Sequence, residues 1–588
     1  MVASLGRTPA YLQNAGFGIG LPSDENKKRE LEEILRTLAL KPGRISIEGI
    51  ERLAKRLGLE MWQEPNKDGG QTVSITGAII VVDIDFIGNN ITQVALSFAN
   101  TLGTSNDLAP QAASILRNNL QPDKPLMISN LADFANNLER LSKLDKLSQA
   151  PALNCFTAIT GLYESLSRIY EHEKTVMDGG AVEAMCRGNG RPRMHCNGKV
   201  GLSVEYWKER RKMPTGGSGK GKERDVKMDG MDMLEPAEQD DPGDKGTTWR
   251  IIIEIDELGA ECASLDTVRT SENWVGKNTI KPSDDSMFGD DYIIDWVDPE
   301  PSVENLMEVD SARPNARFIA RLDPPIVVPL LDEVTIFSSL GLYSPPGQIG
   351  ATTLDGLLFP QALVPGLPPL TRERKVHLPP HMDPLGRVDP SVNHRYTLHT
   401  LKPIYAREVW EIPFGHPRQL GPIFQIFRQY VLLATLLRSC FSPHSNATNN
   451  SSGVLTSPPP PPEPTQIQTP SFTPDDLDSF LSTPAPEPPT GSTPIDISLY
   501  SDPPTPTLRV IFPSHVVPQR LISLEIEVSR NGGVAARYSI VDSPEQVARQ
   551  GGVAGMGRNG LVGEDVVARA IEVTEDVGMT AEWLRRIV

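Results

Sequence analysis

Hydrophobic and polar residues recur with two different periods between residues 42 and 98. In the first part, the apolar side chains from Ile47 to Leu57 return at helical spacing, which predicts a short amphipathic helix. Ser46 suits its N-cap, and Gly58 stands where a helix commonly ends. From residue 80 to 98, apolar and polar residues alternate in two runs joined by a Gly/Asn loop, which is typical of a β-hairpin. A helix followed by an antiparallel hairpin indicates an α+β domain.

Two longer helical patterns follow between residues 130 and 170. Asn130 is placed to cap the first, and Asn154 is placed to cap the second, with Pro151 between them. Each pattern has an apolar stripe on one side, so we expect an αα-hairpin. Two further helices are expected, one from residue 23 to about 40 and one around residues 110–120.

Strand patterns dominate much of the remaining chain. A strand–turn–strand pattern ends at Trp207, and the other expected strands are 248–256, 292–297, 316–323, 326–329, 507–513, 521–528 and 534–542. Long proline-rich connections are expected between about 330 and 390. Residues 411–441 contain a helix that is apolar around nearly its whole circumference, which predicts a buried helix. One or two helices close the chain.

Two segments differ in composition from the rest. Residues 208–247 are charged and poor in apolar residues, and residues 442–506 are rich in Pro, Ser and Thr. Both are predicted to be disordered inserts. The first begins with the basic run Lys208–Lys212, a candidate nuclear localisation signal, and the Ser/Thr-Pro steps of the second are candidate phosphorylation sites.

The predicted fold class is therefore α+β: a large multi-layer domain of amphipathic helices and mostly antiparallel sheets, interrupted by two disordered inserts. The expected parts are a flexible tail (1–20), a helix and hairpin part (21–207), a charged insert (208–247), a β-rich part ending in a buried helix (248–441), a Pro/Ser/Thr-rich insert (442–506) and a C-terminal hairpin with helices (507–588).

Charge and cysteine content narrow the classes of function. The formal net charge is −18 with a pI near 5.1, so direct nucleic acid binding is not expected. Five widely spaced cysteines indicate a reducing compartment rather than a disulfide framework. The N-terminus does not read as a signal peptide, and the apolar run Tyr430–Leu437 is too short to span a bilayer. We expect a soluble, intracellular protein with no membrane contact.

Few residues suggest chemistry. Cys186, His195 and Cys196 invite a zinc site, but no second ligand pair follows, and strand–turn–strand is the preferred interpretation. A GxGxxG match at 555–560 lacks the preceding strand that a dinucleotide site requires. His394 and His399 have no nucleophile at a defined spacing. We expect no catalytic residue, no cofactor and no metal.

Two short motifs are candidates for partner binding. Leu433, Leu436 and Leu437 form an LxxLL match, but it lies in the helix predicted to be buried, so we interpret it as core. Leu477, Phe480 and Leu481 alternate with acidic residues inside the second insert, which is typical of a segment that folds on a partner. They are the candidate partner-binding residues.

Several motifs, in one order, resemble the Mediator subunit 1 family in its fungal form. They are GRISIEGIERLAKRLGLE with VDIDF and VALSF, FANNLERLSKLDKLSQAPALNC with LYESL, ARFIARLDPPIVVP, EIPFGHPRQLGPIFQIFRQYVLLATLLRSCF, and the C-terminal piece from about 507.

This resemblance implies a non-catalytic subunit of the middle module of Mediator, a nuclear coactivator that bridges transcription factors and RNA polymerase II. The implied partners are other Mediator subunits, transcription activators and, indirectly, the polymerase. Two alternatives stay open: an unrelated intracellular scaffold or adaptor, and an enzyme whose site is assembled only in the fold. A deep pocket that places His394 or Cys196 beside a perturbed carboxylate would favour the enzyme.

Overall fold

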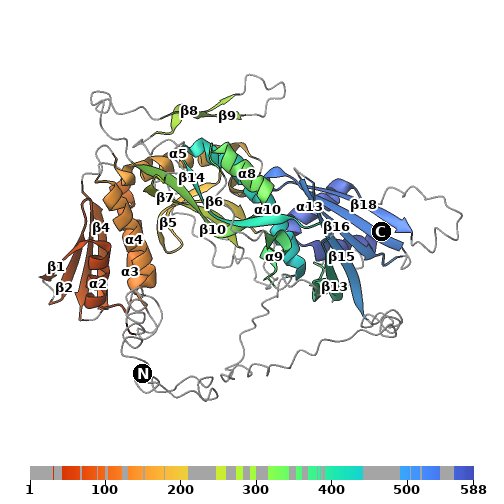
Figure 1. Cartoon of the computed structure of the whole chain (residues 1–588), viewed down its shortest axis with the longest axis horizontal. Coiled ribbons are helices and arrows are strands. Elements are labelled where there is room, and N and C mark those ends of the chain that lie inside the picture. Colours follow the sequence, from red (N-terminus) through yellow and green to blue (C-terminus); the bar gives the residue numbers. More distant parts are fainter. Residues whose placement is uncertain are drawn as a thin grey trace, which may run out of the picture. The chain divides into compact units, whose positions relative to one another are not determined.

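The computed structural model of the chain forms two units (Figure 1). Unit 1 comprises residues 1–160 and 194–201, and unit 2 comprises 161–193 and 202–588. The structure describes residues 31, 43–66, 69–88, 90–99, 104–121, 130–149, 153–177, 179–209, 247–259, 273–282, 292–298, 315–343, 352–360, 369–379, 382–383, 386, 391–400, 402–441, 491–502, 505–516, 520–542 and 562–588. These units divide the chain at other positions than the predicted boundary at residue 207.

Unit 1 is a four-stranded antiparallel sheet with helices on one face. Its strands follow chain order: β1 (Glu60–Pro65), β2 (Gln71–Thr76), β3 (Ile80–Ile87) and β4 (Asn90–Phe98). Its helices are α2 (Ile47–Leu57), α3 (Thr104–Leu120) and α4 (Ala132–Leu147), and α5 (Cys155–Val176) begins in it. The predicted caps of α2 are confirmed, since Ser46 Oγ accepts from Gly49 N at 3.0 Å and Gly58 adopts φ 74°.

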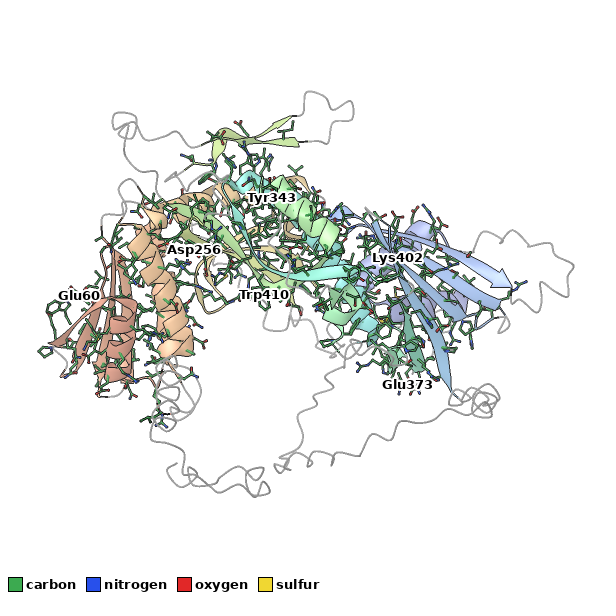
Figure 2. All side chains as sticks on the ribbon, in the orientation of Figure 1. Glu60, Asp256, Tyr343, Glu373, Lys402 and Trp410 are labelled. Atoms are coloured by element: carbon green, nitrogen blue, oxygen red, sulfur yellow. The ribbon has the colours of Figure 1, made fainter. Side chains whose placement is uncertain are left out.

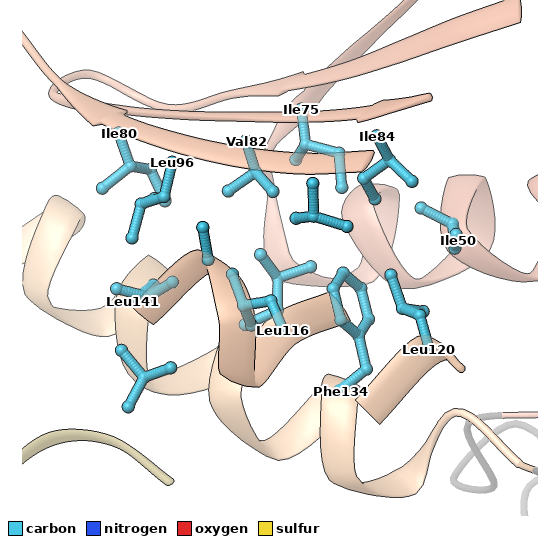
Figure 3. Close-up of a cluster of buried hydrophobic side chains, with 14 of the residues drawn as sticks. Ile50, Ile75, Ile80, Val82, Ile84, Leu96, Leu116, Leu120, Phe134 and Leu141 are labelled. Atoms are coloured by element: carbon cyan, nitrogen blue, oxygen red, sulfur yellow. The ribbon is translucent and has the colours of Figure 1, made fainter. Parts of the chain in front are cut away.

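The core of unit 1 lies between the sheet and these helices. Ile75, Ile80, Val82, Ile84 and Leu96 point from the sheet toward the helical side chains (Figure 3). Strand alternation places them on one face, and helical periodicity supplies the facing stripe. The Asp145 carboxylate of α4 is also buried there and accepts from Ala78 N, Ile79 N and Ile80 N, which fixes the β2–β3 turn to the helix layer.

Unit 2 contains two six-stranded sheets, apart from the strand residues within 194–201, which belong to unit 1. One has the order β11-β14-β10-β7-β6-β5 and the other the order β12-β13-β15-β16-β17-β18. Their strands are β5 (Arg191–Cys196), β6 (Lys199–Lys208), β7 (Thr248–Glu257), β10 (Ala316–Pro329), β11 (Thr352–Thr353), β14 (Tyr405–Phe414), β12 (Thr371–His377), β13 (Ser391–His399), β15 (Ser492–Asp502), β16 (Thr505–Pro513), β17 (Arg520–Val528) and β18 (Val534–Asp542). β13 and β15 pair in parallel, and the other pairings given for these two sheets are antiparallel.

The remaining elements of unit 2 are the two-stranded sheet of β8 (Val275–Pro282) and β9 (Tyr292–Trp296) and several helices. The helices are α6 (Gly180–Arg187), α8 (Leu330–Ser339), α9 (Leu354–Leu358), the 3-10 turn η4 (Pro417–Gln419), α10 (Leu420–Phe441), the 3-10 turn η5 (Arg530–Gly532), α13 (Glu564–Thr574) and α14 (Val577–Ile587). Mostly antiparallel sheets combined with amphipathic helices confirm the predicted α+β class.

Helix α10 is the central helix of unit 2. It packs against β10 of one sheet, β12 and β17 of the other, and α14. Residues 417–441 form one helical stretch among the described residues that is long and apolar enough to cross a membrane, but 78% of its apolar window is buried inside the protein. By length this helix could span a bilayer, although the continuous apolar run Tyr430–Leu437 alone could not, and its burial is that of the predicted core helix.

Several predicted boundaries were wrong. Strand β15 lies inside the segment predicted to be an insert up to residue 506: Ile495, Ile497 and Leu499 alternate into the core despite the neighbouring Thr-Pro steps. The two strands predicted at 316–323 and 326–329 are one strand, β10, whose register shifts between Arg321 and Ile326 and so accommodates two prolines.

Other elements were missed. Strands β1 and β2 are not among the expected strands, and α8, α9 and β12 lie where long proline-rich connections are expected. Residues 210–246 and 442–490, which hold most of the two predicted inserts, lie outside the described residues.

Candidate interaction site

The LxxLL leucines are part of the core of unit 2. Leu433, Leu436 and Leu437 are only 1%, 0% and 2% exposed. An LxxLL helix docks by laying its leucines into a partner's groove, which requires them to be accessible. In this fold the three leucines contact other parts of the chain instead.

Replacing Leu436 by alanine is expected to destabilise unit 2 by about 3 kcal/mol, because the substitution opens a cavity in a packed core. Thermal unfolding of the full chain measures the effect. Leu331→Ala is the matched control, since Leu331 on α8 is 58% exposed, and its unfolding midpoint should stay near that of the wild type. If Leu436→Ala leaves the midpoint unchanged but abolishes binding of a partner, the motif is a docking motif after all.

Two other sequence motifs lie outside the described residues. These are the candidate partner-binding residues Leu477, Phe480 and Leu481, and the GxGxxG match at 555–560. The partner-binding role of the first and the absence of a cofactor site at the second stay predictions.

The residues of the zinc hypothesis have other environments. Cys186 is buried in α6, while His195 lies at the β5–β6 turn with φ 48° and accepts from Gly201 N through Nδ1 at 3.1 Å. Burial lowers the pKa of His195 to about 4. No group of three or more His, Cys, Asp or Glu side chains that could hold a metal ion occurs within the described ranges. The strand–turn–strand interpretation is confirmed.

His394 belongs to a buried ionic network. Its Nε2 lies 3.0 Å from Glu582 Oε2 and its Nδ1 lies 3.0 Å from the Tyr396 hydroxyl. Because Glu582 is a carboxylate, Nε2–H donates to it. The imidazole is fully buried, so this arrangement orients strands and helices and offers no open face to a substrate.

Arginines complete this network. Glu582 also accepts from Arg585 Nε at 2.8 Å and Arg586 Nε at 2.7 Å, and Arg586 pairs with Asp383. Burial alone would raise the pKa of Glu582, but the hydrogen bonds from His394, Arg585 and Arg586 outweigh burial and lower the pKa from 4.5 to about 2. The perturbed carboxylate is therefore explained by structural partners.

Arg428 at the middle of α10 joins segments that are far apart in the sequence. Its guanidinium donates to Tyr206 O at 3.0 Å, Met185 O at 3.0 Å, Gly188 O at 2.6 Å and Asn531 Oδ1 at 2.6 Å. The side chain is fully buried, and burial lowers its pKa to about 10, so it remains charged at neutral pH. The sequence signal for this residue is an arginine among apolar neighbours well inside a helix, whereas the other arginine of α10, Arg438, lies in its last turn.

A cavity of about 490 Å³ opens beside Arg428 in unit 2. Its lining comes from the α5–α6 region, β9 and the first turns of α10, and includes Arg187, Arg418, Gln425, Trp296 and Ile293. Arg418 is 54% exposed and lies 3.8 Å from Asp298, so its guanidinium is accessible. Arg187 is held by Glu183 and Glu572.

The cavity suits binding more than chemistry. Guanidinium groups beside an indole and isoleucines provide contacts for an anionic group next to an apolar one. Its described lining residues include no Cys, Ser, Thr or His, and its carboxylate, Glu173, is buried and accepts from Asn189 N and Nδ2. The lining thus presents no pair of nucleophile and base.

Comparison with known proteins agrees with the motifs. The family described as Mediator of RNA polymerase II transcription subunit 1 matches residues 32–442 of the chain. The protein of that name from Schizosaccharomyces pombe is 32% identical over 167 residues, which are 28% of this chain and 35% of that relative. The chain therefore spans about a third of the length of this relative. The cavity and the LxxLL leucines lie inside the family match, and residues 507–588 lie outside it.

Proposed function

We propose that the chain works as a non-catalytic subunit of the Mediator complex, because it belongs to the family of Mediator of RNA polymerase II transcription subunit 1. The observation that carries the proposal is the family match over residues 32–442, which includes all of unit 1 that the structure describes except Leu31, and most of unit 2. The relative's printed name assigns that protein to the same complex.

The finer proposal concerns the role within the complex. We place the chain in the middle module, where it acts in the nucleus as a coactivator between transcription factors and RNA polymerase II. The buried ionic networks support this role, because they stiffen the fold without exposing reactive groups, and a rigid body suits protein docking. Because the net charge is negative, direct contact with nucleic acid is unfavourable, and we propose that any such contact is made through protein partners.

We propose that the two predicted inserts are regulatory segments. Residues 210–246 begin within the basic run Lys208–Lys212, whose first residue ends β6, and the segment from 442 to about 490 carries Leu477, Phe480 and Leu481 among acidic residues and Ser/Thr-Pro steps. We propose that both are disordered, that the first supports nuclear import, and that the second offers phosphorylation sites and a partner-binding segment.

Affinity purification tests the proposed function. The tagged full-length chain is purified from its own cells at moderate salt, and co-purifying proteins are identified by mass spectrometry, with an unrelated nuclear protein under the same tag as control. Middle-module Mediator subunits together with polymerase are the expected result. A cytosolic set of proteins without Mediator subunits would contradict the proposal and favour the scaffold alternative.

A further inference from the structure

The sheet of unit 1 has one face that no described residue buries. Cα pairing between the four strands places twelve residues on this outer face, in three rows that cross β1, β2, β3 and β4. The rows are Glu60-Thr76-Val81-Ser97, Trp62-Ser74-Asp83-Ala95 and Glu64-Thr72-Asp85-Gln93. Each of the twelve side chains is exposed or half-buried, while the β2, β3 and β4 residues of the two rows between them are buried in the core. A sheet face without a covering layer is available to a partner.

The charge of this outer face has one sign. It carries four carboxylates, from Glu60, Glu64, Asp83 and Asp85, and the described residues of the four strands include no basic side chain. The sequence from 60 to 98 holds a single basic residue, Lys67. The hydroxyls of Thr72 and Ser74 each donate to an aspartate at 2.6 Å, which fixes the two carboxylates in place without neutralising them.

Trp62 gives the outer face an aromatic contact point. Its side chain is 60% exposed, and it lies on β1 between Glu60 and Glu64 (Figure 2 labels Glu60). Residues two apart on a strand share a face and lie roughly 7 Å apart, so an indole is flanked by two carboxylates. An aromatic face combined with carboxylates favours Arg or Lys, because cation–π attraction and charge-assisted hydrogen bonds act on the same group.

The edge of the sheet adds a backbone contribution. β1 is the first strand in the order β1-β2-β3-β4 and pairs only with β2 among the described strands. Its outer edge therefore presents N–H and C=O groups that an extended segment can pair with. Such a segment has alternate side chains on the outer face, next to Glu60, Trp62 and Glu64.

We propose that β1 binds an extended segment of a partner protein that carries Arg or Lys at alternate positions and adds to the sheet as a further strand. Charge complementarity selects the occupant: the outer face repels acidic segments and nucleic acid and attracts cations. The alternation of the cations follows from strand geometry, because only every second side chain meets the acidic face. This inference rests on the geometry of unit 1 and holds whether or not the chain is a Mediator subunit.

Peptide binding to the full-length chain, measured by calorimetry, tests the inference. The probe is a short peptide with alternating Arg and Thr, compared with a peptide of equal composition in which the arginines form one block. We expect the alternating peptide to bind more tightly, and its affinity to fall at high salt because the contacts are ionic. N-methylation of the probe at the residues that would donate to β1 should abolish the preference.

Substitutions locate the site. Trp62→Ala is expected to weaken binding of the alternating peptide by about 5-fold, and the double change Glu60→Gln with Glu64→Gln by about 10-fold at low salt. Trp410→Ala is the matched control, because Trp410 on β14 is 59% exposed and should leave the affinity unchanged (Figure 2). All three sites are at the surface, so the fold should persist.

Contrary outcomes are clear. Equal affinity of the wild type and the Trp62 and Glu60/Glu64 variants, or no binding of the alternating peptide, would overturn the site. A block peptide or an N-methylated peptide that binds as tightly as the unmodified alternating peptide would overturn strand addition. The two tests are independent. Absence of Mediator subunits from the purification would not contradict strand addition, and absence of peptide binding would not contradict membership in Mediator.

Discussion

Replacing Arg428 by methionine is expected to destabilise unit 2 by about 3–5 kcal/mol. Methionine fills similar space but donates no hydrogen bond. The carbonyls of Tyr206, Met185 and Gly188 and the Asn531 side chain then lose a charged donor in a buried site. Thermal and urea unfolding of the full chain measure the loss.

Arg569→Met is the control for this prediction. Arg569 is 67% exposed and pairs with Glu572 at the surface, where an ion pair contributes about 0–1 kcal/mol. Arg428→Lys should be intermediate, because it keeps the charge but lacks the planar fork that reaches separate carbonyls. An unchanged unfolding midpoint in Arg428→Met would show that the arginine does not hold these segments together.

Replacing Glu582 by glutamine is expected to destabilise unit 2 by about 3–5 kcal/mol at neutral pH, because His394, Arg585 and Arg586 then lose their shared buried anion. The effect should depend on pH. The pKa of Glu582 falls from 4.5 to about 2 on folding, so its contribution is complete above pH 4.5 and is lost as the pH falls toward 2.

Unfolding free energies of wild type and Glu582→Gln at neutral pH and in acid measure this dependence. The difference between the two proteins should shrink as the pH falls from 4.5 toward 2. Glu525→Gln is the control, since Glu525 on β17 is 49% exposed and its ion pair with Arg509 is long, at 3.8 Å. A difference that is constant across this window would contradict the assigned role of the carboxylate.

Local patterns predicted local structure well. Ser46 and Gly58 cap the two ends of α2 as predicted, because capping depends only on neighbouring residues. The apolar circumference of residues 420–441 predicted a buried helix, because a helix with no polar stripe has no solvent face. The two runs between 80 and 98 pair as predicted, since a short loop leaves only one practical register.

Long-range arrangements were not predictable from the sequence. His394 and Glu582 are 188 residues apart, and no local pattern indicates that they meet. β15 was assigned to an insert because proline-rich composition masks a short alternating run, and its pairing with β13 and β16 reveals the strand. β1 was missed because an edge strand with nearly all of its side chains exposed and few apolar residues resembles a loop.

The sequence also does not predict the interaction surfaces, because each combines residues that are far apart in the chain. Strand pairing places Glu60, Glu64, Asp83 and Asp85 on one face of unit 1 and so gives that face its negative charge. In the sequence these four residues form no recognisable motif. The cavity beside Arg428 likewise combines residues from the α5–α6 region, β9 and α10. The family resemblance indicated what kind of protein this is, and the fold is needed to indicate where partners bind.

Reciprocal purification tests the central claim most directly. Mediator is purified through a tag on a different subunit, and the amount of this chain is measured by quantitative mass spectrometry relative to that subunit. Membership in the complex predicts that the chain is recovered in an amount comparable to the other middle-module subunits and withstands moderate salt. Absence of the chain, or recovery at the level of the untagged control, would contradict the account.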